Sequence, residues 1–167
     1  MPKGTKRDIT PKADDLWRGI GGNFDNLTQI ICEFVDNSIS NFIGNPGTYK
    51  DIWIDVKKSG NQYNFKIEDT GTGFDKFEVA MKLGDMTGGS TPLNEHGFGM
   101  KHALATACPT NKKWAVYTQT KSDLSKSKDR VRFMKSPYKF VMYEQKQKTW
   151  PGRHKDTGTQ IQFTVNE

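Results

Sequence analysis

The pattern of apolar and polar positions predicts one long helix early in the chain. After residue 25, apolar side chains return every three or four positions, as they do on one face of a helix. The stripe consists of Leu27, Ile30, Ile31, Phe34, Val35 and Ser38. Asp25 or Asn26 can serve as the N-cap, and the helix should end near "GNPG" at residues 44–47. Residues 1–25 are polar, and we interpret them as an N-terminal strap and a turn before the domain of residues 26–167.

Alternating apolar and polar residues then predict a β-hairpin. The segments "DIWIDVKK" (51–58) and "QYNFKIED" (62–69) flank a turn that contains Gly60. Later patterns predict helices at 75–84 and 100–108 and strands at 113–120, 131–135, 138–145 and 159–165. Residues 121–130 read as a polar loop. Residues 85–99 are rich in Gly, Thr and Asn and have no period, which is typical of a functional loop.

Composition narrows the class of protein. A chain of 167 residues is long enough for one domain with its own core. Its two cysteines, Cys32 and Cys108, are too few and too scattered for a disulfide scaffold or a zinc site. No apolar run approaches the roughly 20 residues of a membrane span, and the N-terminus lacks the apolar middle of a signal peptide. We therefore expect an intracellular protein without a membrane partner.

Charge is concentrated in one region. Residues 112–155 hold 13 Lys or Arg against three acidic residues, a local net charge of +10, which leaves −4 for the rest of a chain whose net charge is +6. Such a stretch can contact DNA or another nucleic acid, but it can also be a solvated surface. The sequence of this region shows no alternation of aromatic and basic residues of the kind that stacks bases.

Three polar motifs carry the candidate chemistry. On a helix, Glu33 and Asn37 are four residues apart, so their side chains leave the same face and can converge on one small object. "DTGTGF" places Asp69 at the end of a strand, where it can also simply cap the turn. "GFGMK" places Gly97 and Gly99 directly before a helix, whose free N–H groups suit an anion. Neither a P-loop motif nor a G-x-G-x-x-G motif occurs.

The order of these motifs resembles the GHKL ATPase superfamily. That order is E-x-x-D-N on a helix, D-x-G-x-G after a strand, a long loop that closes on G-x-G, and G-T on a late strand. Here the matching residues are Glu33, Asp36, Asn37, Asp69, Gly71, Gly73, Gly97, Gly99, Gly158 and Thr159. The superfamily includes the gyrase B subunit, ninety-kilodalton heat-shock chaperones, sensor histidine kinases, MutL repair proteins and MORC proteins. "EFVDNS" and "GFGMKHA" look most similar to MORC-type domains.

The resemblance implies a fold and a set of roles. The fold would be the Bergerat fold, a two-layer α/β sandwich with a mixed, mostly antiparallel sheet covered on one face by helices. Glu33 would be the general base, and Asn37 would bind the Mg²⁺ that bridges the phosphates of ATP. Asp69 would accept from the adenine amine, with Thr159 nearby. The other nucleotide contacts would be Gly71, Gly73, Gly97, Phe98, Gly99 and Lys101, and residues 85–99 would form a lid.

The resemblance also implies a function. We expect a Mg²⁺-dependent ATP-binding domain with slow hydrolysis that forms an ATP-dependent homodimer in a longer protein with a transducer domain. The alternative is a non-hydrolysing scaffold or nucleic-acid interaction module that uses region 112–155. A sensor kinase also needs a phosphoacceptor histidine on a helical hairpin. His96, His102 and His154 have no such setting, and we interpret them as surface or lid histidines.

Overall fold

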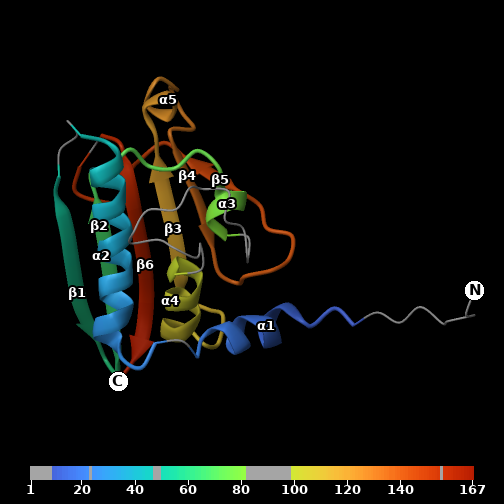
Figure 1. The fold of residues 1–167 in the computed structure, drawn as a ribbon. Helices are drawn as coiled ribbons and strands as arrows, with labels where there is room; N and C mark the ends of the chain where they lie inside the picture. Colours follow the sequence, from blue (N-terminus) through green and yellow to red (C-terminus); the bar gives the residue numbers. More distant parts are fainter. Residues whose placement is uncertain (1–8, 23, 47–49, 82–98, 155) are drawn as a thin grey trace, which may run out of the picture.

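A computed structural model describes residues 9–22, 24–46, 50–81, 99–154 and 156–167 (Figure 1). The helices are α1 (Ala13–Ile20), α2 (Leu27–Gly44), α3 (Phe77–Met81), α4 (Gly99–Ala107) and α5 (Lys121–Leu124). The strands are β1 (Ile52–Ser59), β2 (Gln62–Asp69), β3 (Trp114–Gln119), β4 (Val131–Lys135), β5 (Gln145–Gln147) and β6 (Gly158–Asn166). None of the helices in this part of the chain is long and apolar enough to cross a membrane.

The strands form one six-stranded sheet in the order β1-β2-β6-β3-β4-β5. Each pair in this order is antiparallel, and the C-terminal strand β6 lies in the interior, between β2 and β3. Figure 1 shows α2 and α4 side by side against one face of the sheet. We call this the helix face and the opposite side the open face. The predicted two-layer α/β sandwich is therefore confirmed, and its sheet is antiparallel at every described pair rather than mixed.

The core lies between the sheet and the helix layer. Phe34 of α2 packs against Phe163 of β6 at a ring-centroid distance of 5.5 Å, and Phe163 stacks on Phe65 of β2 at 4.9 Å. Leu104 of α4 is fully buried in the same cluster. Because full burial of one such side chain contributes roughly 1.5–3 kcal/mol, this contact layer fixes α2 and α4 relative to the central strands.

Helix α1 was not predicted, because residues 1–25 were interpreted together as a polar strap, although four of the eight residues of α1 are apolar. One side chain anchors it: Trp17 is fully buried, stacks on Trp114 at 5.3 Å, and donates from its indole N–H to the carbonyl of Cys108 at 2.8 Å. Leu16, Trp17 and Ile20 have the spacing of one helix face, and Ile20 packs against the same core as Trp17, so a short helical signal was present in the sequence. Part of that strap is in fact a helix docked on the core.

The strand predicted at 138–145 is wrong. Among the described residues between β4 and β6, the short β5 is the only strand, and it pairs with β4 at residues 145–147. The Asn111 side chain takes up the backbone of Tyr138 instead: its amide donates to the Tyr138 carbonyl at 2.9 Å, and its oxygen accepts from the Tyr138 N–H at 2.6 Å. The N–H and C=O groups of Tyr138 are therefore not available to a sheet ladder at the start of the predicted strand.

The predicted polar loop at 121–130 contains the one-turn helix α5. Thr120 and Asp123 form a capping box at its start, and Asp123 is buried against Arg132 of β4, whose Nε lies 2.9 Å from its carboxylate. A buried charge needs such a partner, so the loop is tied to the sheet by this ion pair.

Candidate functional site

Helix α2 positions the first two candidate side chains. The Asn26 side chain caps its start by accepting from the N–H of Gln29 at 3.0 Å. About three turns further along the helix, the Asn37 amide donates to the Glu33 carbonyl at 2.8 Å and to Glu33 Oε1 at 3.3 Å. The expected convergence of Glu33 and Asn37 on one face is confirmed, and the amide holds the carboxylate in place.

Glu33 faces the first residue of α4. A Cβ placed on Gly99 would lie 1.5 Å from Glu33 Oε1, so only glycine leaves room for the carboxylate there. Burial raises the pKa of Glu33, the Asn37 hydrogen bond partly offsets this effect, and the charge of Asp36 adds to the rise. A half-buried carboxylate with a raised pKa, set against a helix N-terminus, is suited to taking a proton from a water molecule.

Asp69 lies beneath the helix layer, at the end of β2, and is only 7% exposed. Its Oδ1 accepts from the N–H groups of Gly71 at 2.9 Å and Thr159 at 3.2 Å, and its Oδ2 accepts from the Ser38 hydroxyl at 2.9 Å. Burial raises its pKa, and these hydrogen bonds only partly offset the rise. Asp69 thus forms a fixed, largely desolvated acceptor.

The register of the sheet places the G-T motif of β6 beside Asp69. Thr159 of β6 lies opposite Asp69 of β2 on one side and Thr118 of β3 on the other. Thr118 in turn accepts the N–H of Phe74 at 2.9 Å, which ties the loop after β2 to β3. Residues separated by some 90 positions in the chain therefore form one line across three strands.

The two glycines of the loop after β2 are tightly packed. A Cβ on Gly71 would lie 2.3 Å from Oδ1 of Asn41. Gly73 has φ +68°, and a Cβ there would lie 2.7 Å from the carbonyl oxygen of Gln119. We expected Gly73 to leave room for an adenine base, and the structure gives it an additional role in a left-handed turn against β3.

Sequence reasoning missed two side chains that shape this site. Asn41 binds two polar groups of Thr72: its Oδ1 accepts from the backbone N–H at 2.9 Å, and its Nδ2 donates to the hydroxyl at 2.9 Å. Its position, four residues after Asn37, was the available signal, since it continues the polar stripe of Glu33. Ser38 was assigned to the apolar stripe, and it is buried, but its hydroxyl binds Asp69.

The phosphate side of the expected site is described in part. Lys101 lies in the first turn of α4 and is only 1% exposed, and Gly99 begins that helix. Gly97, Phe98 and the rest of the expected lid, 85–98, lie outside the described residues. The structure thus brings Glu33, Asn37 and Gly99 together, and joins Asp69 to Gly71 and Thr159, beneath one helix layer.

A match to a family model shows the family of this chain. The model described as "Histidine kinase-, DNA gyrase B-, and HSP90-like ATPase" matches residues 22–166. The chain belongs to the GHKL ATPase superfamily. It is accordingly an ATP-binding domain with the Bergerat fold, and nothing in this match selects the MORC-type branch. A search of curated proteins found no significant match to the chain.

The residues of this GHKL domain fit ATP. An ionised carboxylate offers about four acceptor positions, and the described donors to Asp69 are the three named above, so one position is left for an amine. No group of three His, Cys, Asp or Glu side chains in the described residues could hold a metal ion by itself. Mg²⁺ commonly takes one or two protein oxygens together with phosphate oxygens and water, which Asn37 beside Glu33 would permit.

A second polar cluster occupies the open face of the GHKL sheet, and sequence reasoning missed it. Glu68, next to Asp69 in β2, is 3% exposed and accepts from the Trp150 indole at 2.9 Å, the Gln160 amide at 2.9 Å and the Arg153 N–H at 2.9 Å. Burial alone would raise the pKa of Glu68, but hydrogen bonds from His154, Trp150 and the backbone lower it to about 2. This carboxylate fixes the loop before β6.

His154 belongs to that cluster, so its interpretation as a surface or lid histidine is wrong. Its side chain is 10% exposed. Nδ1 contacts Glu68 Oε1, and Nε2 lies 2.9 Å from the carbonyl oxygen of Thr157. Since neither partner can donate, both ring nitrogens carry protons in this arrangement. Burial alone would lower the pKa of His154, but Glu68 and the Thr157 carbonyl raise it.

Proposed function

We propose that this domain hydrolyses Mg²⁺-ATP slowly and acts as a nucleotide-gated dimerisation switch in a larger MORC-, MutL- or gyrase B-like protein. The observation that carries the proposal is the Glu33 carboxylate, which Asn37 holds against Gly99 at the start of α4. A pocket that only stored nucleotide would not need a desolvated base at the end of the helix where phosphates bind.

The roles of the other residues follow from their places. Asn37, on the same face as Glu33, contributes an oxygen to Mg²⁺, which supplies charge neutralisation at the phosphates when bound. Asp69 accepts from the adenine amine, and Thr159 beside it completes the base site. Gly97, Phe98, Gly99 and Lys101 contact the phosphates. The free thiols of Cys32 and Cys108 support an intracellular location.

Two substitutions test the catalytic assignment. Glu33→Ala should retain ATP affinity and lose turnover by about 10²–10⁴-fold, the range for a general base. Asn37→Ala should lose the Mg²⁺-dependent part of ATP binding. Calorimetry with and without Mg²⁺ and a steady-state hydrolysis assay measure both effects. Glu78→Ala, which removes an exposed carboxylate from α3, is the control and should match the parent.

The outcome also decides between an enzyme and the non-hydrolysing module. If Glu33→Ala turns over ATP as fast as the parent, the residual hydrolysis does not come from this site and the scaffold interpretation stands. The switch has its own readout, because sedimentation with a non-hydrolysable ATP analogue should show dimers that are absent with ADP. A persistent monomer in the full-length protein with the analogue would contradict gated dimerisation.

A further inference from the structure

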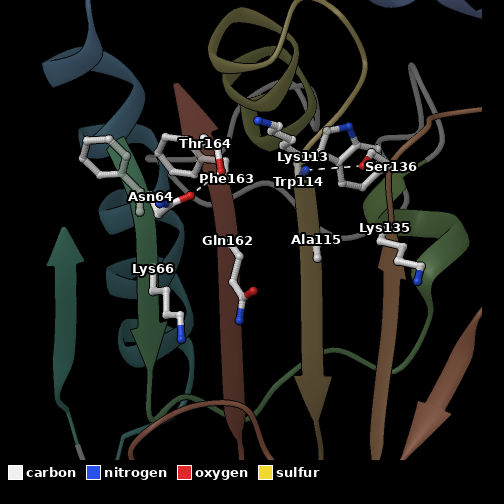
Figure 2. A pocket seen from close by; sticks show the side chains of 11 residues that line it. Asn64, Lys66, Lys113, Trp114, Ala115, Lys135, Ser136, Gln162, Phe163 and Thr164 are labelled. Carbon is white, nitrogen blue, oxygen red and sulfur yellow. Dashed lines mark hydrogen bonds between the residues drawn. The ribbon is translucent and has the colours of Figure 1, made fainter. Parts of the chain in front are cut away.

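The open face of the sheet carries a shallow hollow of about 390 Å³ (Figure 2). It spans β2, β6, β3 and β4, on the side of the sheet away from α2 and α4. Its charged side chains are Lys66, Lys113 and Lys135, and its polar ones are Asn64, Ser136, Gln162 and Thr164. Three cations thus surround one depression whose described lining contains no carboxylate.

Sheet register explains both the hollow and the spacing of its charges. Lys66, Gln162, Ala115 and Lys135 lie opposite one another in one row across four strands, as Figure 2 shows. Because neighbouring strands are about 4.8 Å apart, the two lysine Cα atoms are roughly 14 Å apart. The small Ala115 side chain leaves the floor open between them. Lys113 stands at the end of the hollow, where its ammonium contacts the side chain of Gln62 at 2.7 Å.

The two carboxylates that neighbour Lys66 on the open face have other partners. Asp55 lies opposite Lys66 on β1, but it forms an ion pair with Arg153. Glu68 is two residues from Lys66 on the same strand, and its oxygens already accept hydrogen bonds from Trp150, His154 and Gln160. The lysine side chains are exposed, so the hollow presents net positive charge to solvent.

An aromatic pair lies directly beside the lysine row. Tyr117 and Phe133 are opposite each other on β3 and β4, two residues along from Ala115 and Lys135, and therefore on the same face. Their rings stack at a centroid distance of 5.2 Å and an interplanar angle of 26°. Both side chains are partly exposed. The sequence hid this arrangement, because the aromatic and basic residues come from different strands.

We propose that this open face binds single-stranded nucleic acid, with Lys66, Lys113 and Lys135 contacting phosphates and the Tyr117–Phe133 pair stacking a base. The proposal does not depend on ATP hydrolysis. It narrows the basic region 112–155 to two of its lysines and adds Lys66 from outside it. Positive grooves next to aromatic platforms are the common solution for single strands, because every base has a face that can stack.

The aromatic pair separates the candidate partners. An acidic peptide would use the lysines but would have no need of paired rings at the sheet surface. A duplex keeps its bases stacked inside and is usually read by a helix or ribbon that enters a groove, whereas this face is a shallow depression. A single strand uses both the charges and the rings.

The test is fluorescence anisotropy with a labelled single-stranded oligothymidylate at several salt concentrations. The variant K66Q/K113Q/K135Q should bind at least tenfold more weakly. Each phosphate contact with a single strand contributes about 0.7 to the slope of log affinity against log salt, so the slope should fall by about 2. Tyr117→Leu and Phe133→Leu should each weaken binding severalfold with the slope unchanged.

The matched control K12Q/K50Q/K121Q removes the same charge from exposed lysines outside the hollow. It should bind nearly as the parent does. Circular dichroism establishes that each variant folds, and ATP binding provides a second measure of the intact helix face. Equal losses in the two triple variants, an unchanged slope in the hollow variant, or equal affinity for polyglutamate or duplex DNA would each overturn the proposal.

Discussion

Glu68 and Asp69 are neighbours on one strand, yet the sheet directs them into two different regions. Asp69 lies on the helix face and accepts from Gly71, Ser38 and Thr159, and burial raises its pKa. Glu68 lies on the open face, where donors from the loop before β6 hold its pKa at about 2. Both carboxylates are more than 90% buried, so burial alone does not distinguish them.

The difference lies in how completely the chain satisfies each group. Glu68 receives hydrogen bonds from Trp150, Arg153 and Gln160 and from both the backbone N–H and the ring of His154, so the acceptor capacity of the carboxylate is filled. Its role is to stabilise the fold. Asp69 receives one fewer than it can accept from the described residues, and it lies beside the line of motif residues. An incompletely satisfied buried acceptor is the signature of a ligand site rather than of a structural ion.

The largest expected effect comes from removing the satisfied carboxylate. Glu68→Ala leaves the His154 imidazolium and the Trp150 indole buried without their acceptor. Removing one partner of a buried pair costs about 3–5 kcal/mol, so we expect a loss of that order in the free energy of unfolding, measured by urea denaturation. Glu78→Ala should unfold like the parent. If Glu68→Ala were as stable as the parent, Glu68 would not have the stabilising role that its hydrogen bonds indicate.

Asp69→Asn should give the opposite result. The Ser38 hydroxyl can turn to accept from the new amide, and the side-chain oxygen still accepts from Gly71, so the free energy of unfolding should change little. ATP affinity should fall about 10–100-fold, since a hydrogen bond to a charged group contributes roughly 1.5–3 kcal/mol. Calorimetry measures this loss, with exposed Asp75→Asn as the control. Equal ATP affinity in the two variants would place the adenine elsewhere.

These two carboxylates also show what the sequence could and could not predict. Local patterns were enough for α2, the hairpin β1–β2 and the motif containing Asp69, because helical and strand periods and glycine spacing are local. The Glu68 cluster was not predictable, because its donors lie more than 80 residues away and come from an irregular loop. The contact that holds the chain at Tyr138 is also remote in sequence, because it comes from Asn111, 27 residues earlier. Helix α1 is different, since Leu16, Trp17 and Ile20 already have helical spacing, and only its anchor on Cys108 is remote.

Two glycines allow a matched test of the two faces. A Cβ on Gly152 would lie 2.0 Å from a Glu68 oxygen, and one on Gly99 would lie 1.5 Å from a Glu33 oxygen. Overpacking of this kind costs about 1–3 kcal/mol. We expect Gly152→Ala to lower the free energy of unfolding by that amount and to leave ATP turnover unchanged. Gly99→Ala should displace Glu33 and reduce turnover, with a smaller loss of stability, because alanine favours helix α4. If both variants lost stability and ATP turnover to the same extent, the open face would not be independent of the nucleotide site on the helix face.

The smallest expected effect is in the pH dependence of stability. The pKa of Glu68 falls from 4.5 to about 2 on folding, so its contribution is complete above pH 4.5 and is lost as the pH falls toward 2. The pKa of His154 rises from 6.5, so its contribution is complete below pH 6.5 and is lost as the pH rises through the folded value. The cluster should therefore stabilise the domain most between about pH 4.5 and 6.5. Each proton contributes up to about 1.4 kcal/mol per pH unit to the slope.

Asp69 should act in the opposite direction on the acid side. The pKa of Asp69 is raised from 3.8 on folding, so its contribution to stability is complete below pH 3.8 and is lost as the pH rises through the folded value. At acid pH, stability therefore rises with pH because of Glu68, and Asp69 makes this rise smaller. Urea denaturation at a series of acid pH values should show that the free energy of unfolding rises more steeply with pH in Asp69→Asn than in the parent, and less steeply in Glu68→Gln. If both substitutions change this slope in the same direction, the two carboxylates do not have the opposite electrostatic environments that their hydrogen bonds indicate.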